Sequence, residues 1–158
     1  MLFRSEFPEP ADAMISVSMG EQSEKSLRLW FDRTIAAQLD WGEAYDKLRW
    51  AYRTRWYGTP TWTYELGLEA ARTGRFDTNV PHQYWLCLLD MLNESETWQK
   101  MMARPEALAT LRAVCEGYLN ADEAAFPPRS LLTIWLIGCW GAEQRSEERR
   151  VGKECRSR

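Results

Sequence analysis

The stretch YELGLEAARTGRFDTNVP, which spans Tyr64 to Pro81, contains the signals that decide the fold. Gly74 suits the left-handed backbone conformation that ends many helices, because glycine adopts a positive φ at little steric cost. Gly67 has no side chain, so we expect a neighbouring helix to approach closely at that position. Phe76 is expected to close the open end of the hairpin, and Pro81 marks the start of the next helix. The stretch therefore predicts two helices joined by a tight turn.

The residues before this stretch predict one helix start and two earlier helices. Thr59 and Pro60 form a start signal, because a hydroxyl caps free N–H groups and proline has no N–H to leave unpaired. Further upstream, apolar residues recur at spacings of three and four from Leu27 to Leu39, which is typical of an amphipathic helix. A second pattern of this kind runs from Ala44 to Trp56 and stops before Gly58.

The residues from Val80 onward predict the second helix of this stretch and three more. The first opens at Val80-Pro81, a short one follows from Ser95 to Met102, and a third opens at Arg104-Pro105. The last is capped by Ser130 and is apolar on all sides. No segment has the alternating pattern and turn residues of a β-hairpin. We therefore predict an all-α fold of antiparallel helical hairpins that stack on one another as an α-solenoid.

The residues around the central turn resemble a degenerate tetratricopeptide repeat. Leu66 and Gly67 stand where such repeats place Leu-Gly in their first helix. Gly74 follows Gly67 by seven residues, as the turn glycine of a repeat does, and Phe76 takes the next aromatic position. The pattern departs from the family at Asn79, where a small alanine is expected.

A wider resemblance covers about residues 44–140 and is carried by the motif Arg55-Trp56-Tyr57-Gly58-Thr59 and by residues 73–81. This segment is similar to uncharacterised bacterial proteins of tetratricopeptide-like type, some of which are classed as domains of unknown function. The resemblance implies a helical-repeat scaffold and carries no catalytic activity over to this chain. We expect structural roles for Gly58, Gly67, Gly74, Phe76, Asp77 and Pro81.

Both ends of the chain have an unusual sequence. Residues 145–158, RSEERRVGKECRSR, resemble the translation of an adapter used in sequencing libraries, and residues 1–5, MLFRS, resemble the partner adapter. We therefore interpret both segments as non-native; the alternative is a genuine basic tail that binds nucleic acid or a membrane surface. Residues 6–22 are expected to be a linker or the remnant of a preceding element, and residues 23–144 a helical-repeat domain truncated at both ends.

The composition narrows the class of partner. The whole chain has a net charge of -3, and without the two end segments it has 13 basic and 20 acidic residues, a net charge of -7. Such an acidic chain is poorly suited to the phosphate backbone of nucleic acids. The longest uncharged run, Ser130 to Ala142, is shorter than the roughly 20 residues of a membrane-spanning helix. We therefore expect a cytoplasmic protein with no nucleic-acid or membrane partner.

Few side chains suggest chemistry. Cys87, Cys115 and Cys139 are far apart in the sequence and lie among apolar residues, so we interpret them as buried structural thiols. His82 is the only histidine and has no nucleophile at a typical spacing. We therefore predict no catalytic residue, no metal site and no cofactor.

Nine tryptophans in 158 residues are the unusual number. Most fall on or beside apolar stripes, so core packing is their default role, whereas Trp41 and Trp50 lie off the main stripes. Arg72 and Arg75 cluster about the Gly74 turn with Asp77, either as a network that locks the turn or as an anion-binding loop. Trp41, Trp50, Arg72 and Arg75 are therefore the candidate partner-binding residues.

Two functions remain open from the sequence. The first is a non-enzymatic scaffold that binds a protein or peptide in a concave groove lined by Trp, Tyr and Arg. The alternative is a fragment of a helical enzyme, a hydrolase or glycan-acting domain, whose catalytic residues lie partly outside the chain. A deep pocket in which His82 meets carboxylates would favour the enzyme.

Overall fold

The computed structural model describes residues 7–21, 23–56, 58–92, 104–127 and 129–139, and throughout these ranges the regular structure is helical with no strand. The all-α prediction is therefore confirmed. The order of elements is α1 (Glu9–Gly20), α2 (Glu24–Ala37), α3 (Gly42–Ala51), the 3-10 turn η1 (Thr54–Trp56), α4 (Pro60–Arg72), α5 (Gln83–Leu92), α7 (Pro105–Asn120) and a last helix over residues 129–139.

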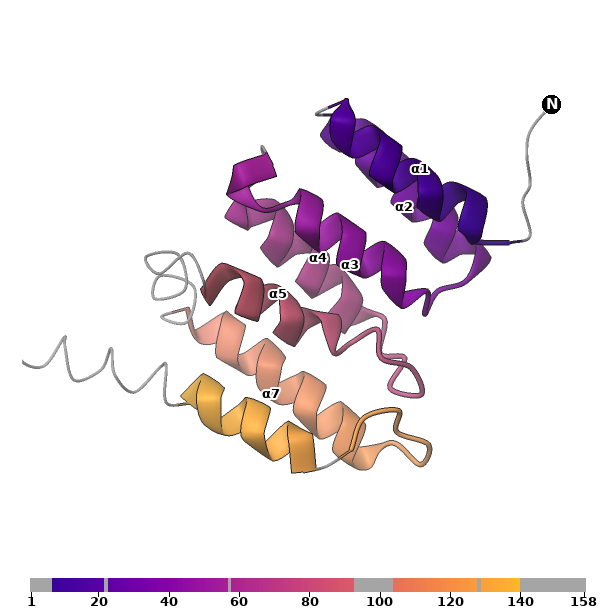
Figure 1. Cartoon of the computed structure of the whole chain (residues 1–158). Helices are drawn as coiled ribbons and strands as arrows, with labels where there is room; N and C mark the ends of the chain where they lie inside the picture. Colours follow the sequence, from indigo (N-terminus) through magenta and orange to yellow (C-terminus); the bar gives the residue numbers. More distant parts are fainter. Residues whose placement is uncertain (1–6, 22, 57, 93–103, 128, 140–158) are drawn as a thin grey trace, which may run out of the picture.

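The helices lie side by side and follow one another through the molecule in chain order (Figure 1). α1 packs on α2, and α4 packs on α5. α3 touches both α1 and α5, so these three helices form one layer. α4 touches α7 and is bonded to α2 through Arg28 and Glu69, so α2, α4 and α7 form a second layer. The result is a layered array of helices.

Local signals in the sequence set the helix starts. The Ser23 hydroxyl accepts a hydrogen bond from the Ser26 N–H at 3.2 Å, at the start of α2. The Thr59 hydroxyl accepts one from the Trp62 N–H at 3.2 Å, and Pro60 is the first residue of α4, as the sequence predicts. The Ser23 and Thr59 bonds satisfy N–H groups that the first turn of a helix leaves free. α7 also has a proline, Pro105, as its first residue, but it has no side-chain capping bond.

Residues 6–22 were expected to be a linker or the remnant of a preceding element, and within them Glu9–Gly20 form the helix α1. Its buried face consists of Ala11, Asp12, Ile15 and Ser18, so only Ile15 is large and apolar. Small and polar residues give little periodic signal, which is why the pattern was weak. Lys47 on α3 forms an ion pair with Asp12 and so holds α1 in place.

Two further helix boundaries differ from the prediction. α3 ends at Ala51 and does not continue to Trp56, because the chain turns at residues 52–56, with the 3-10 turn η1 at Thr54–Trp56. In this turn the Gly58 N–H donates to the Arg53 carbonyl at 3.2 Å, and a Cβ on Gly58 would lie 2.0 Å from the Tyr52 carbonyl oxygen. α5 begins at Gln83, after a turn that contains Pro81. The predicted helix from Ser95 to Met102 and both adapter-like ends lie outside the described residues.

Two apolar cores share the α4–α5 pair. The N-terminal core takes Leu66 and Ala70 from α4 and Cys87 from α5, and the C-terminal core takes Tyr64, Tyr84 and Leu88 from the same two helices. The remaining members of the N-terminal core are Ile15, Leu27, Phe31, Ala44, Tyr45, Leu48, Ala51, Tyr52 and Val80. Those of the C-terminal core are Trp85, Met91, Ala107, Leu111, Val114, Cys115, Tyr118, Leu131 and Ile134.

Gly67 lies at a close approach between α4 and α5. A Cβ on Gly67 would lie 3.0 Å from the Cβ of Cys87 and 3.3 Å from the Cα of Tyr84. Neither atom can rotate away, because both are fixed to the backbone of α5. The absence of a side chain at Gly67 therefore sets the spacing of the two helices that join the cores.

The turn between α4 and α5 is built on Gly74, whose φ is 61°. Phe76 follows the turn and packs edge-on against Tyr118 of α7, with ring centroids 5.1 Å apart. A Cβ on Gly117 would lie 2.0 Å from the Phe76 ring, so Gly117 makes room for that ring. The Tyr118 hydroxyl donates to the Thr78 carbonyl at 2.9 Å and accepts from the His82 N–H at 3.1 Å. Tyr118 thus fixes the segment that leads into α5.

None of the described helices combines the length and the apolar character that crossing a bilayer requires.

We predict that Gly67→Ala destabilises the protein. Alanine favours a helix over glycine, but here its methyl group would push α4 from the backbone of α5, at a cost of about 1–3 kcal/mol. The free energy of unfolding in urea measures the change. Gly20→Ala is the control, because a Cβ at Gly20 meets no atom within 4 Å. A Gly67→Ala protein as stable as the Gly20→Ala protein would contradict the close approach.

Candidate interaction surface

Trp50, near the C-terminus of α3, is the predicted partner-binding tryptophan that is most exposed, at 40%. Two guanidinium groups lie over its ring: the Cζ of Arg53 is 4.6 Å and that of Arg55 is 4.2 Å from the ring centroid. The chain turns directly after α3, and the Trp56 N–H donates to the Arg53 carbonyl at 2.8 Å. This tight turn brings Arg53 and Arg55 back over the ring. Such contacts are attractive because the face of an indole is electronegative.

Asp90 on α5 forms ion pairs with two arginines, Arg49 and Arg53. Its carboxylate accepts from Arg49 at 3.0 Å and from Arg53 at 2.6 Å, and only 11% of the Asp90 side chain is exposed. Arg49 also binds Asp46 at 2.6 Å. One nearly buried carboxylate therefore orients two guanidinium groups and joins α3 to α5, which makes this end of the layer rigid.

Arg55 differs from Arg49 and Arg53 in its partners. Within the described part of the chain no carboxylate lies within ion-pair distance of Arg55, and its contact is the Trp50 ring. Trp56, in the same 3-10 turn, is 46% exposed. We call Trp50, Arg53, Arg55 and Trp56 the Trp50 surface. It combines exposed aromatic area with a guanidinium that no acidic residue of the described chain neutralises.

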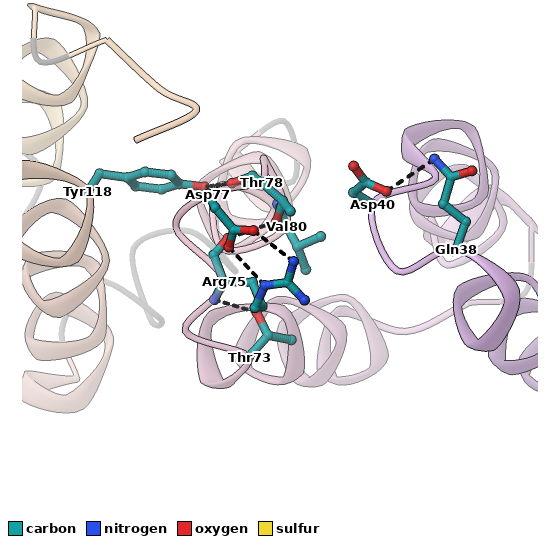
Figure 2. Close-up of polar contacts among 8 residues, drawn as sticks. All are labelled: Gln38, Asp40, Thr73, Arg75, Asp77, Thr78, Val80 and Tyr118. Carbon is teal, nitrogen blue, oxygen red and sulfur yellow. Dashed lines mark hydrogen bonds and ion pairs between the residues drawn. The ribbon is translucent and has the colours of Figure 1, made fainter. Parts of the chain in front are cut away.

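The other predicted binding residues do not join this surface. Trp41 directly precedes α3, at the opposite end from Trp50, and it is partly buried against the N-terminal core. Arg72 is the exposed last residue of α4. Arg75 lies in the following turn, and Asp40, next to Trp41 in the sequence, faces that turn (Figure 2). Trp41 and Trp50 therefore lie at opposite ends of α3, whereas Arg72 and Arg75 belong to the end of α4 and the turn after it.

Arg75 is engaged within its own turn. Its Nε and Nη2 atoms donate to the two oxygens of Asp77 at 2.8 and 2.7 Å, and the pair is about half exposed (Figure 2). The hydrogen bond from Arg75 lowers the pKa of Asp77, and the same bond raises the pKa of Arg75. Thr78 adds a hydrogen bond from its hydroxyl to the Arg75 carbonyl at 2.7 Å. The arrangement fits a network that locks the turn.

His82 has a structural environment. Its ring stacks on Phe126, with centroids 4.1 Å apart and an interplanar angle of 26°. Burial, with a smaller contribution from the charge of Arg49, lowers the pKa of His82 to about 4. The imidazole is therefore neutral at pH 7 and is held against an aromatic ring.

The buried thiols are also poor nucleophiles. Burial raises the pKa of Cys87 to about 12 and that of Cys115 to about 11. Both thiols stay protonated at neutral pH, and the thiolate is the reactive form. Among the described residues, no group of three or more His, Cys, Asp or Glu side chains is placed to hold a metal ion.

A concave feature lies between α7 and the helix at residues 129–139. It has a volume of about 410 Å³, and its walls are mainly apolar, with Arg112 and Glu116 at one side. The lining residues are Arg112, Cys115, Glu116, Leu119, Leu131, Leu132 and Trp135. Leu132 and Leu136 are 60% and 67% exposed, so the outer face of the last helix is not covered by the described chain.

The tryptophans contribute less to the core than their number suggested. Of the tryptophans in the described ranges, Trp85 alone is buried, at 6% exposure. The largest fully buried side chains are instead Tyr84 and Tyr118. Tyr84 is satisfied by a hydrogen bond from its hydroxyl to the Ala107 carbonyl at 3.0 Å. The tyrosines therefore fill the centre, and Trp30, Trp41, Trp62 and Trp135 pack around it.

Comparison with known proteins does not add to these observations: no protein-family model, no curated protein and no solved structure matches the chain. The described structure is an all-helical array that carries an exposed cluster of arginine and tryptophan side chains.

Sequence reasoning missed Arg53, Arg55 and Trp56 as members of the surface, and Asp90 as the carboxylate that holds Arg53. The spacing W-x-x-R-x-R-W from Trp50 to Trp56 carried a local signal, since two arginines lie between two tryptophans. Asp90 gave no such signal, because its distance of 37 residues from Arg53 is bridged only by the packing of α3 on α5.

We predict that Asp90→Asn destabilises the protein by about 1–3 kcal/mol, because it leaves two guanidinium groups without their shared carboxylate. Urea unfolding measures the loss. Glu116→Gln is the matched control: its partner Arg112 is exposed, and such pairs contribute less than about 1 kcal/mol. Equal effects of the two substitutions would contradict the anchoring role of Asp90.

We predict that the single histidine makes the protein less stable as the pH falls from about 6.5 toward 4. The unfolded chain binds a proton at His82 in this range, whereas the folded protein, with a pKa of about 4, does not. Because solvent reaches part of the ring, we expect His82 to account for a loss of about 1 kcal/mol by pH 5.

NMR titration of the His82 ring measures the pKa, and the urea stability of His82→Gln between pH 6.5 and 5 measures the linkage. The variant should lose less stability than the parent over this range. A His82 pKa at or above 6.5 in the folded protein would overturn the prediction.

Proposed function

We propose that the protein is a non-enzymatic helical-repeat scaffold of tetratricopeptide-like type that binds a protein or peptide through the Trp50 surface. The observation that carries the proposal is the exposed Trp50 ring with Arg53 and Arg55 stacked on it. Tryptophan and arginine are the residues most often found at the energetic centres of protein interfaces. A cytoplasmic location, a bacterial source and the lack of a nucleic-acid partner belong to the same proposal.

Rigidity supports this role for the surface. A binding residue that is already held in its bound position loses little entropy when the partner arrives. Asp90 holds Arg53 at 2.6 Å, and the turn after α3 holds Arg55 over Trp50 at 4.2 Å. The aromatic and cationic groups are therefore ordered before any partner binds.

The alternative, a fragment of a helical enzyme, gains no support from the described residues. Its expected sign was a pocket where His82 meets carboxylates, and the His82 ring instead stacks on Phe126. The charged group that contributes to the lowered His82 pKa is Arg49, a cation. These contacts favour a structural role for the histidine.

We predict that the 158-residue chain selects peptides from a displayed random library and that Trp50→Ala weakens their binding at least about tenfold. Isothermal titration calorimetry with the selected peptides measures the change, and circular dichroism checks that each variant is folded. Trp50 is 40% exposed, so its removal should leave the fold intact.

Arg33→Ala is the matched control. Arg33 lies 4.6 Å from the Trp30 ring centroid, so it makes the same kind of contact on α2, away from the Trp50 surface. Its loss should leave peptide binding unchanged. A library that yields no binding peptide, or peptides that bind Trp50→Ala and the parent equally, would contradict the proposed function.

A further inference from the structure

We propose that the Trp50 surface recognises an acidic peptide segment of a partner protein, in which an Asp or Glu carboxylate pairs with Arg55 while a neighbouring apolar side chain packs on Trp50 and Trp56. This inference rests on the proposed function and adds the chemistry of the ligand.

The charges at the surface indicate what a ligand would supply. Arg49 and Arg53 are matched by the carboxylates of Asp46 and Asp90. Arg55 is matched by no acidic residue of the described chain and holds its position against an aromatic ring. Among the described residues, three guanidinium groups therefore face two carboxylates at this end of α3, so one positive charge is unmatched. A ligand that supplies a carboxylate would complete the set.

The Arg55 guanidinium has a shape that suits a carboxylate. A guanidinium is planar and carries its N–H groups along its edge, in a geometry that matches both oxygens of a carboxylate. The Cζ of Arg55 lies 4.2 Å from the Trp50 ring centroid, and Arg55 is exposed. The protein shows the same pairing elsewhere, where Arg75 binds both oxygens of Asp77 at 2.8 and 2.7 Å.

The charged area of the surface is small. Nucleic acids and anionic membranes are held by many cations at once. Among the described residues the excess here is a single positive charge, and the whole chain has a net charge of -3, which repels a polyanion. One or two carboxylates on a short peptide fit this balance better than a phosphate backbone does.

The surface also offers apolar area to a ligand. Trp50 and Trp56 are 40% and 46% exposed, and they flank the two arginines in the sequence. Indole area of this kind is buried by apolar or aromatic side chains in protein interfaces. The surface therefore favours a segment in which an acidic residue and an apolar residue are close together.

The test uses the peptides that the random library yields with the 158-residue chain. We expect the selected sequences to be rich in Asp or Glu beside an apolar residue. Replacing their Glu with Gln, or replacing Arg55 with Gln in the protein, should weaken binding at least about tenfold, and raised salt should weaken it further. Arg55→Lys, which keeps the charge but loses the planar group, should restore only part of the affinity. Arg33→Gln should have no effect.

The outcomes separate this inference from the proposed function. If the selected peptides are neutral or basic, or if their Gln versions bind equally well, the acidic ligand is wrong and the peptide-binding scaffold stands. If no peptide is selected, both fail. If an oligonucleotide or a phosphatidylserine vesicle competes for the surface more tightly than the selected peptides do, and Arg55→Gln abolishes that binding, the peptide source of the carboxylate is overturned.

Discussion

The close approach of α4 and α5 at Gly67 is the constraint on which the rest of the structure depends. A single missing side chain lets the backbone of α5 come within van der Waals contact of α4. Because the two helices are this close, each can supply apolar residues to both cores, Leu66 and Cys87 on one side and Tyr64 and Tyr84 on the other. Interiors are packed too densely to accept an added methyl group without displacement. The two cores are therefore joined by one helix pair.

Ion pairs complement the apolar packing by linking helices of the same layer. Lys47 joins α3 to Asp12 on α1, and Asp90 on α5 binds both Arg49 and Arg53 at the end of α3. In the second layer, Arg28 of α2 binds Glu69 of α4 at 2.6 Å, and hydrogen bonds to the acidic partners raise the pKa of Arg28 against the effect of burial. These bonds specify which helix neighbours which. At α3 they also place the arginines that stack on Trp50.

Much of the fold was predictable because its signals are local. Thr59, Pro60 and Gly74 act on the backbone of their own turns. The start of α4 and the positive φ of Gly74 in the turn after α4 therefore follow from the sequence. α1 was not predicted because its buried face carries only one large apolar residue, Ile15. Of the site, exposed Trp50 was predictable from its position off the apolar stripe, but Asp90 was not, since its contact with Arg53 exists only once α3 and α5 have packed.

Native-state hydrogen exchange, followed residue by residue, tests most directly whether the α4–α5 pair joins the two cores. Amides that open only when the whole protein unfolds exchange slowest. The structure predicts that the slowest amides lie in α4 and α5, around Leu66 and Leu88, which are 1% and 0% exposed. Slow exchange confined to α1–α2 or to α7, with α4 and α5 exchanging early, would contradict the account.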